Sequence, residues 1–496
     1  TEADTLLAAK ATNTALATKL PLTGGTMTGN LATAGISSVT AGTSNFVAGV
    51  NAGNSIVSGG NYNTLVGDEA GTAVTTGAEN TAVGKGALQN NTTGGDNVAV
   101  GLNALVSQTT GSSSVAIGKE SLQNNTTGGS NVAIGKDTLK GNTTGSDNTA
   151  VGKDSLRSNT TANNNTAVGG AALQANTTGT ENTSVGSVSL DANTTGDRNT
   201  AVGHESLGSN TTADNNTGVG YGALNANTTG ANNTAVGSGA LEINTTGAYN
   251  SAFGHHTLDA NTTGSYNTAT GRASLGYNTT GQFNSAAGYV SLLNNTTGQK
   301  NTGSGAYSGA NLSTGIENTF IGYNAGGTRT TGSNNVCIGY NSGHDGTTSS
   351  DLLFIARNNT GPSNAATWIF GDSAGACRQG NNATTWTQTS DERIKKNIVD
   401  SPNGLAKIDA LQVRNFNYRT EEEITVEGLT GCDATGLQVG VIAQEIEAVL
   451  PEAVTESDSG QKQVQTDPIF WSMVKAIQEL SAQNAALEAR LTALEE

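Results

Sequence analysis

The side chains of this chain that could do chemistry are few and widely spaced. Ser390 is followed five residues later by Lys395, and a serine hydroxyl can act as a nucleophile when a lysine amine removes its proton. The amine is competent only where burial or nearby cations lower its pKa, to which Arg393 and Lys396 could contribute. A serine and a lysine at this spacing also occur by chance, so the pair alone does not indicate a catalytic site.

Histidines and cysteines do not form a pattern typical of a metal or redox site. His204 and His255 occupy equivalent repeat positions three turns apart, about 14 Å, which is too far to share an ion. His256 adjoins His255 and is expected to point elsewhere. The three cysteines are far apart and lack CxxC spacing. We therefore expect no metal site and no cofactor.

Acidic residues do not suggest hydrolysis of polysaccharide. A solenoid that cleaves glycans would carry paired carboxylates on adjacent turns. Acids such as Asp96, Glu120 and Asp154 are expected to occupy different columns of the repeat. We therefore expect the shaft to have no glycosidase activity.

Three aromatic residues occupy equivalent positions in consecutive repeats. Tyr249, Tyr266 and Phe283 each precede the first asparagine of the next repeat, so their rings should stack on the outside of the rod. Exposed aromatic rings of this kind can bind sugars, which makes these residues candidates for facing a glycan. The alternative is a ladder that only stabilises the rod.

A repeat of 17 residues dominates the middle of the chain. From Asn80 the sequence reads NTAVGKGALQNNTTGGD, and the period holds without insertion to the copy at Asn335. A weaker copy at Asn63 and a degenerate one at Leu352 bring the total to about eighteen turns. Apolar residues recur in short β-prone runs bounded by glycine and asparagine rather than at helical spacing. The sequence therefore predicts a parallel β-solenoid with one repeat per turn.

Several positions of the repeat have a structural role. The fourth is mostly valine or isoleucine, as in Val83 and Ile117, and is expected to form a buried β-branched column. The glycine after it is expected to end a short strand, and the leucine four residues later to form a second apolar column. Asparagines at the twelfth position are expected to stack into an amide ladder; among them are Asn91, Asn125, Asn142, Asn159 and Asn176.

The third position of the repeat bears on assembly. It is almost always small, as in Ala82 and Ala99, which is expected where a second face packs against neighbouring chains. Each turn has about three substantial apolar side chains, worth about 1.5–3 kcal/mol each, which barely offsets the entropy of ordering one turn. We therefore infer a homotrimer with the rod along its threefold axis.

Composition and charge exclude several classes of partner. The 496 residues include 23 basic and 40 acidic residues, for a net charge of −17, so the basic surface that binds nucleic acid is missing. No run of eighteen apolar residues occurs, and membrane insertion is not expected. Aromatic residues make up 4% of the chain, too few for several ordinary globular cores.

The chain divides into four segments. Residues 1–45 are an N-terminal connector that begins with an alanine-rich helix over 1–19, and the shaft spans 46–356. A non-periodic segment over 357–389 is expected to cap the shaft. From residue 390 charge density rises and helical patterns appear, which predicts a small α+β domain over 390–496.

The last segment of the chain has a heptad pattern. From Asp467 onward, apolar residues alternate spacings of four and three, with Asn484 as the one polar residue of the seam. This pattern predicts a three-stranded coiled coil over 467–496, whose register Asn484 would set.

Two parts of the sequence resemble known families. SVAIG at 114–118 resembles the head repeats of trimeric autotransporter adhesins of the YadA type, and the NTAVG and NTTG pattern resembles the longer-period arrays of bacteriophage tail-fibre proteins. The segment 390–496, with SDERIKKNI, FNY and QVGVIAQEIE in order, resembles the endosialidase-type intramolecular chaperone domain of phage tail spikes and fibres.

The second resemblance implies a specific activity. In that family the domain trimerises, helps the preceding β-rich stalk to fold, and cuts itself off with a serine–lysine dyad. Mapped residue by residue, the resemblance implies that Ser390 is the nucleophile, that Lys395 is the base, and that the cleaved bond is Thr389–Ser390.

Together these interpretations predict an all-β trimeric solenoid rod followed by a chaperone domain that ends in a trimeric coiled coil. We expect a phage tail fibre for host attachment, made in the host cytoplasm and located in the virion, whose C-terminal domain releases itself by autoproteolysis. Expected partners are two further copies, other tail or baseplate proteins upstream of Thr1, and a host surface glycan. The alternatives are a tail spike with a glycan-binding shaft and a bacterial trimeric adhesin. An adhesin of that type should end in membrane-spanning strands rather than in LEARLTALEE, which favours the virion.

Overall fold

The computed structural model describes most of the repeat region and part of the C-terminal segment. The described residues are 36–37, 41–343, 348–357, 367–371, 373, 377–379, 399, 401, 404–419, 423–424, 436–456 and 460–495. The chain forms two compact units, residues 1–386 and 387–496. The helix expected over 1–19 lies outside the described residues.

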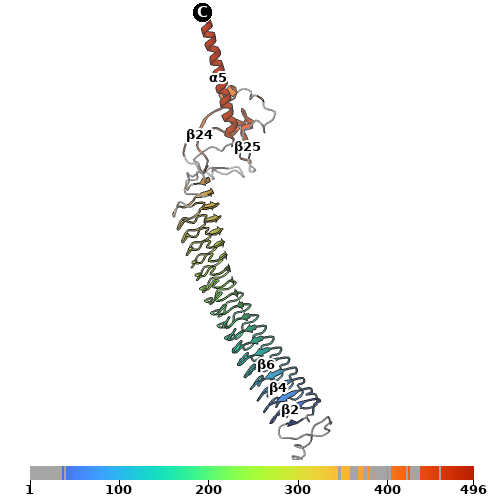
Figure 1. Ribbon diagram of the computed structural model, residues 1–496. Helices are drawn as coiled ribbons and strands as arrows, with labels where there is room; N and C mark the ends of the chain where they lie inside the picture. The colour runs from blue at the N-terminus through green and yellow to red at the C-terminus, as the bar shows by residue number, and fades with distance from the viewer. Residues whose placement is uncertain are drawn as a thin grey trace, which may run out of the picture. The chain divides into compact units, whose positions relative to one another are not determined.

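The first unit is a parallel β-solenoid whose turns stack one on the next (Figure 1). Eighteen parallel pairings run from β2 (Phe46–Ala48) to β20 (Leu353–Ala356). From β3 onward each residue pairs with the residue 17 positions later, as Ala82 does with Ala99. The predicted solenoid and its period are confirmed. The intervening strands are β3 Thr64–Val66, β4 Thr81–Val83, β5 Val98–Val100, β6 Val115–Ile117, β7 Val132–Ile134, β8 Thr149–Val151, β9 Thr166–Val168, β10 Thr183–Val185, β11 Thr200–Val202, β12 Thr217–Val219, β13 Thr234–Val236, β14 Ser251–Phe253, β15 Thr268–Thr270, β16 Ser285–Ala287, β17 Thr302–Ser304, β18 Thr319–Ile321 and β19 Val336–Ile338.

Antiparallel strands flank both ends of the parallel ladder. Strand β1 (Ile36–Ser37) pairs antiparallel with β2. At the other end β21 (Thr367–Gly371) pairs antiparallel with β20, and β22 (Cys377–Gln379) pairs with β21. Because an open edge strand exposes unpaired backbone groups, these strands cover edges of the ladder that would otherwise pair with other chains.

Alanine and leucine fill the interior of each turn. Ala82, third in its turn, and Leu88, ninth, have no exposed surface, and most of their equivalents along the shaft share one continuous core. The fourth position points outward, so that Val83 is 37% exposed and Ile117 is 39% exposed. Since successive side chains of a strand point to opposite faces, a buried third residue requires an outward fourth.

Two expectations about the strand were therefore wrong. The β-branched column lies on the outer face rather than in the core. The small third position packs inside its own turn rather than against neighbouring chains, so a single chain already encloses a continuous core. The small size of the third residue reflects the narrow interior of the turn, and it does not by itself indicate a trimer.

The interior volume of a turn is fixed, as the exceptions to the pattern show. Where Phe320 replaces the third-position alanine, the ninth position is Gly326 in the same turn and Gly309 in the turn before. A Cβ at Gly309 would lie 2.5 Å from the Phe320 ring, and one at Gly326 would overlap it. Leu65 is likewise matched by Gly71, whose Cβ would lie 2.8 Å from the leucine methyl groups. In these turns a glycine at the ninth position makes room for the large third residue.

The glycine after each strand meets two requirements. At Gly84 φ is +136°, a conformation essentially confined to glycine. A Cβ at this position would lie 2.5 Å from the carbonyl oxygen of Gly101 in the next turn. The corner predicted at this glycine is confirmed, and close stacking of the turns explains why glycine occupies this position in every turn from Gly67 to Gly339.

Two ladders of asparagine side chains run inside the shaft. At the twelfth position Asn142 donates to Asn125, Asn159 to Asn142, and Asn176 to Asn159, each at 2.8–2.9 Å, which confirms the predicted ladder. Asn91 does not join it, because the next turn has Gln108 and the Asn91 Oδ1 has no hydrogen-bond partner in the described part of the chain.

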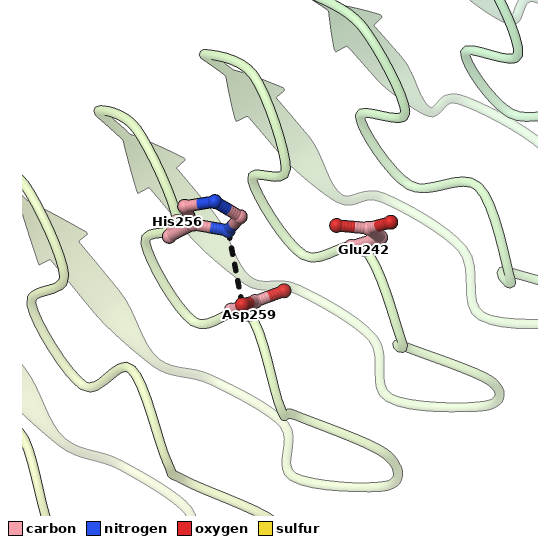
Figure 2. Close-up of side chains that lie close together, drawn as sticks. All are labelled: Glu242, His256 and Asp259. Carbon is pink, nitrogen blue, oxygen red and sulfur yellow. Dashed lines mark ion pairs between the residues drawn. The ribbon is translucent and has the colours of Figure 1, made fainter.

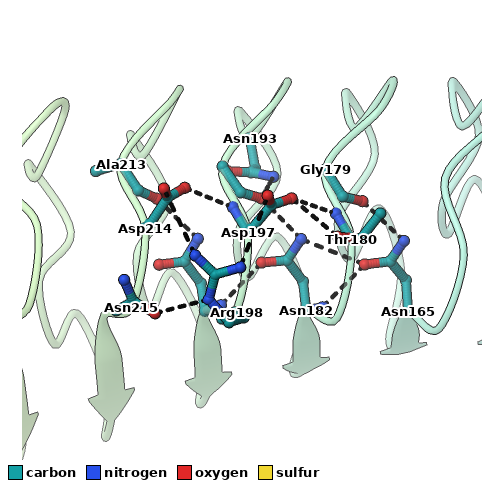
Figure 3. A network of polar contacts seen from close by, with 12 residues as sticks. Asn165, Gly179, Thr180, Asn182, Asn193, Asp197, Arg198, Ala213, Asp214 and Asn215 are labelled. Atoms are coloured by element: carbon teal, nitrogen blue, oxygen red, sulfur yellow. Dashed lines mark hydrogen bonds and ion pairs between the residues drawn. The ribbon is translucent and has the colours of Figure 1, made fainter.

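The second ladder, at the first position of the repeat, was missed in the sequence. The Nδ2 of Asn182 donates to the Oδ1 of Asn165 at 3.2 Å, and the backbone N–H of Asn182 donates to the same oxygen at 2.9 Å (Figure 3). Because these amides are buried, each hydrogen bond satisfies a group that would otherwise be costly to enclose.

The second unit combines short strands with helices. Strand β23 pairs antiparallel with β24, and β25 with β26. Ile446, Leu450 and Ala453 form its small buried core. The predicted α+β character is confirmed. The elements are α3 Gly404–Ala410, β23 Arg414–Phe416, β24 Gln438–Gly440, α4 Ala443–Glu447, the 3-10 helix η3 Pro451–Ala453, β25 Val454–Glu456, β26 Lys462–Val464 and α5 Thr466–Glu495. Within the described ranges, no helix is both long and apolar enough to cross a membrane.

Candidate functional site

The candidate catalytic residues Thr389, Ser390 and Lys395 lie outside the described residues. Their arrangement therefore stays a prediction. The first described element of the same unit is α3, which begins nine residues after Lys395. The contacts of α3 and of the elements after it show how the domain that would carry the dyad is held together.

A carboxylate of α5 caps the start of α3. Glu479 accepts hydrogen bonds from the backbone N–H groups of Leu405 at 2.7 Å and Gly404 at 3.0 Å. The first N–H groups of a helix have no partner within it, so a carboxylate there satisfies donors and complements the helix dipole. These bonds from Leu405 and Gly404 hold the pKa of Glu479 below its ordinary value.

Ion pairs on the surface join further elements of this unit. Arg414 of β23 donates two hydrogen bonds to Glu445 of α4, at 2.8 and 3.1 Å, and this contact raises the pKa of Arg414. Lys407 of α3 contacts Glu452 of η3 at 2.9 Å and lowers the pKa of that carboxyl. All four side chains are partly exposed, so each pair contributes little to stability and mainly fixes orientation.

Helix α5 exposes the apolar seam that the sequence predicted. Met473 is 46% exposed, Ile477 66% and Leu480 48%, while Ser472 and Ala476 are buried against the rest of the unit. Asn484 is exposed on the same helix. The predicted helix is confirmed, and in a single chain its seam has no partner among the described residues. The remaining exposed members of the seam are Leu487, Leu491 and Leu494.

The aromatic ladder predicted on the shaft is confirmed. The rings of Tyr249 and Tyr266 stack with centroids 5.0 Å apart and planes at 2°, and Phe283 stacks on Tyr266 at the same distance. Each ring is about half exposed. The stack presents a flat apolar surface to solvent, and its binding of sugars stays a prediction.

A second aromatic run on the shaft was missed in the sequence. Tyr289, Tyr307, Tyr323 and Tyr340 lie on successive turns with neighbouring centroids 5.3–5.7 Å apart. Tyr307 sits at the seventh position of its turn and the others at the sixth, so a search within one column does not find the run. The signal that could have revealed it is a series of tyrosines spaced by 16 to 18 residues.

The expectation about carboxylates was wrong. Glu120, Asp137 and Asp154 share the seventh position of consecutive turns, so acids do stack on adjacent turns. Lys140 donates to both Glu120 and Asp137, and its ammonium group lowers the pKa of Glu120. Burial raises the pKa of Asp137, but Lys140 and Lys136 outweigh it, and the net direction is downward. The general acid of a glycosidase needs a raised pKa, so the lowered pKa of each carboxyl does not suit it to that role.

A second pair of stacked acids consists of Asp197 and Asp214, whose carboxylates accept hydrogen bonds from the backbone. The backbone N–H of Asp197 donates to Asp214 Oδ1 at 2.8 Å, and that of Thr180 donates to Asp197 Oδ1 at 2.7 Å (Figure 3). The guanidinium of Arg198 lies within 4.0 Å of both carboxylates. These acids therefore bind the backbone of successive turns.

The C-terminal unit matches a known family. Residues 390–455 match the family model described as chaperone of endosialidase. The match begins at Ser390, where the sequence resemblance begins, and ends before helix α5. A β-solenoid shaft of about eighteen turns followed by a chaperone-of-endosialidase segment is the organisation of a phage tail-fibre or endosialidase-type protein.

Proposed function

We propose that this protein is a trimeric phage tail fibre for host attachment, whose C-terminal domain drives trimerisation and folding and then releases itself by autoproteolysis. The observation that carries the proposal is the match of 390–455 to the chaperone of endosialidase, in a chain whose preceding part is a repetitive β-shaft. The fibre is located in the virion and joins other tail or baseplate proteins.

Two exposed apolar surfaces support the trimer. The heptad seam of α5, from Met473 to Leu494, leaves large apolar side chains in water when the chain is alone. Such a seam is stable when buried against copies of itself. The outward valine and isoleucine column of the shaft, which includes Val83 and Ile117, is a second surface that neighbouring copies can cover.

The repetition of the shaft explains why a chaperone is needed. Each turn offers nearly the same strand and the same asparagine groups, so a turn that pairs with the wrong neighbour still makes most ladder bonds. Parallel pairing also forms slowly, because the chain between strands must be ordered first. A domain that trimerises at one end fixes the starting register of three chains.

The cleavage chemistry uses groups of this chain alone. Ser390 Oγ attacks the carbonyl carbon of Thr389 while the neutral amine of Lys395 accepts the hydroxyl proton. The peptide C–N bond then breaks, and its nitrogen takes that proton to become the amino group of Ser390. Water hydrolyses the resulting ester to the Thr389 carboxylate and the free hydroxyl. An isolated lysine has a pKa near 10.4, so the amine must be desolvated, which a packed trimer provides.

Denaturing electrophoresis with intact-mass measurement tests the cleavage. The wild-type chain should separate into fragments of 389 and 107 residues after the trimer has formed. Ser390→Ala should abolish the cut, and Lys395→Ala should reduce it strongly, while both variants remain trimers in sedimentation velocity. Ser401→Ala, which removes a hydroxyl from the same unit, is the matched control and should be cut normally. Normal processing of both dyad variants, or an uncut wild-type trimer after prolonged incubation, would contradict the assignment.

The chaperone role has a separate test. A chain of residues 1–389 should give insoluble protein or rods of mixed register, whereas the Ser390→Ala chain should give soluble trimers. Soluble, homogeneous trimers of 1–389 would overturn the chaperone role and leave the cleavage chemistry untouched.

A further inference from the structure

Three side chains of the kinds that ligate metals converge on the shaft. Glu242 is tenth in its turn, and His256 and Asp259 are seventh and tenth in the next turn, so stacking of the turns brings them together (Figure 2). One ligand atom from each lies within 4.8 Å of the others. His256 Nδ1 is 3.0 Å from Asp259 Oδ2.

The lone pairs of this cluster require either a proton or a cation at its centre. His256 Nδ1 is shielded from water and makes no well-aligned hydrogen bond to any described residue. A neutral imidazole with its proton on Nε2 would direct the Nδ1 lone pair at carboxylates that also present lone pairs. Either a proton on Nδ1 or a bound cation must lie between them.

Other turns show how a base can neutralise the same columns. In two turns an acid at the seventh position is contacted by a base at the tenth: Lys140 contacts Asp137, and Arg157 contacts Asp154. At the cluster around His256 the tenth positions of two consecutive turns are both acids. One imidazole faces these two carboxylates, and neither turn supplies an ammonium or guanidinium at its seventh or tenth position.

The backbone leaves room for an ion between the three groups. Gly239 is seventh in the turn of Glu242, and its missing Cβ would lie 2.6 Å from His256 Nδ1 and 3.1 Å from Glu242 Oε2. The space over Gly239 is therefore bordered by two of the three ligands. On the side of the following turn, His256 and Asp259 also border a solvent-open hollow, which Arg272 and Tyr277 help to line.

We propose that Glu242, His256 and Asp259 bind a divalent transition-metal ion. Zn²⁺ is the ion used to test this site. One imidazole nitrogen and two carboxylate oxygens suit Zn²⁺ and its first-row neighbours, with water in the remaining coordination positions. The ion links two consecutive turns through side chains alone and stabilises that part of the shaft. The site is independent of the proposed self-cleavage.

Titration calorimetry of the full chain with Zn²⁺ tests the site. The wild-type protein should bind one more Zn²⁺ per chain than His256→Ala or Asp259→Asn, each of which should lose the site or weaken it by at least about tenfold. His204→Ala is the matched control, because His204 is an exposed histidine 3.8 Å from the acid Glu205 and should bind as the wild type does. Co²⁺ should give visible d–d absorption that vanishes in His256→Ala.

A pair of glycine variants tests the geometry while keeping all three ligands. Gly239→Ala places a methyl group among the ligand atoms and should abolish the site. Gly222→Ala changes the equivalent glycine one turn earlier, at nearly the same φ, where the nearest Glu242 atom is 3.7 Å away, and should leave Zn²⁺ binding intact. Equal Zn²⁺ and Co²⁺ binding by wild type and His256→Ala would overturn the proposal and leave His256 as a hydrogen-bonding partner of Asp259 alone.

Discussion

Glu479 Oε1 lies 3.0 Å from the backbone nitrogen of Gly404, although the two residues are 75 positions apart in the chain. The contact joins the long helix α5 to the start of α3. Gly404 is buried there, and a Cβ at this position would overlap the backbone of Ala476. The carboxylate of Glu479 thereby joins the helix that carries the heptad seam to the start of α3.

The first prediction concerns the pH dependence of this contact. The pKa of Glu479 is lowered in the folded state, so its contribution to stability is fully present above its ordinary value of 4.5 and is lost as pH falls through the lower folded value. Glu479→Gln should lower the urea midpoint at pH 7, measured by circular dichroism at 222 nm. Below pH 4.5 the urea midpoint of this variant should fall less steeply with decreasing pH than that of the wild type. Glu488→Gln, on the same helix, should change neither. Identical acid profiles for wild type and Glu479→Gln would contradict this account.

The second prediction contrasts two adjacent glycines. Gly169 has φ +139°, and its Cβ would overlap the Gly186 carbonyl, whereas a Cβ at the exposed Gly170 meets nothing within 4 Å. Gly169→Ala should therefore cost at least about 1–3 kcal/mol, and Gly170→Ala should stay within about 0.5 kcal/mol of wild type. Guanidinium unfolding of the full chain measures both. Equal midpoints would show that the turns need not stack this closely.

The third prediction tests the fixed interior volume. Leu156→Gly alone should cost about 2–5 kcal/mol through the cavity it leaves, and Ala150→Leu alone about 1–3 kcal/mol through overpacking. The double variant reproduces the pairing of Leu65 with Gly71 within one turn. Leu139 remains where the turn before Leu65 has Gly53, so the double variant should recover part of the loss. A double-mutant cycle on unfolding free energies gives the coupling, and simple additivity would contradict the reciprocal packing of the two positions.

These contacts show what the sequence could and could not predict. The period, the strand ending at Gly84 and the ladder through Asn142 follow from residue types that recur at one spacing. Which face of the strand points inward did not follow, because Ala82 and Val83 are both apolar and greater hydrophobicity favoured the valine. The deciding quantity was the width of the closed coil, which is a property of the whole turn rather than of a residue.

The candidate sites divide in the same way. Ser390 was singled out by its likeness to a family motif. The family model matches from residue 390 onward, and the role of Ser390 stays a prediction. The cluster of Glu242, His256 and Asp259 was missed, because the sequence search compared histidines within one column. Its members come from the seventh and tenth positions of neighbouring turns and meet along a diagonal that only the stacking of the turns reveals.

The fourth prediction concerns the aromatic ladder on the shaft. Tyr266 stacks on both Tyr249 and Phe283, so Tyr266→Ala should cost about 0.5–1.5 kcal/mol for each lost pair. Ser113→Ala, at an equivalent exposed position with φ +59°, is the control and should be near neutral. Saturation-transfer NMR with methyl glucoside and methyl galactoside probes sugar binding. Signal in wild type that is lost in Tyr266→Ala would support glycan contact, and a loss of stability without any signal would assign the stack a structural role alone.

Pairing each residue with the one 17 positions later makes the length of the shaft a discrete quantity. If 17 consecutive residues are removed from the middle of the shaft, the turns on either side meet with the same strand, the same glycine corner and both asparagine rows in place. The shaft then becomes shorter by one turn, and the contact between the two joined turns is the same as between any other neighbouring turns. Shafts of different length can therefore arise by gain or loss of whole repeats in the gene. Each such event changes the length of the shaft by a whole number of turns.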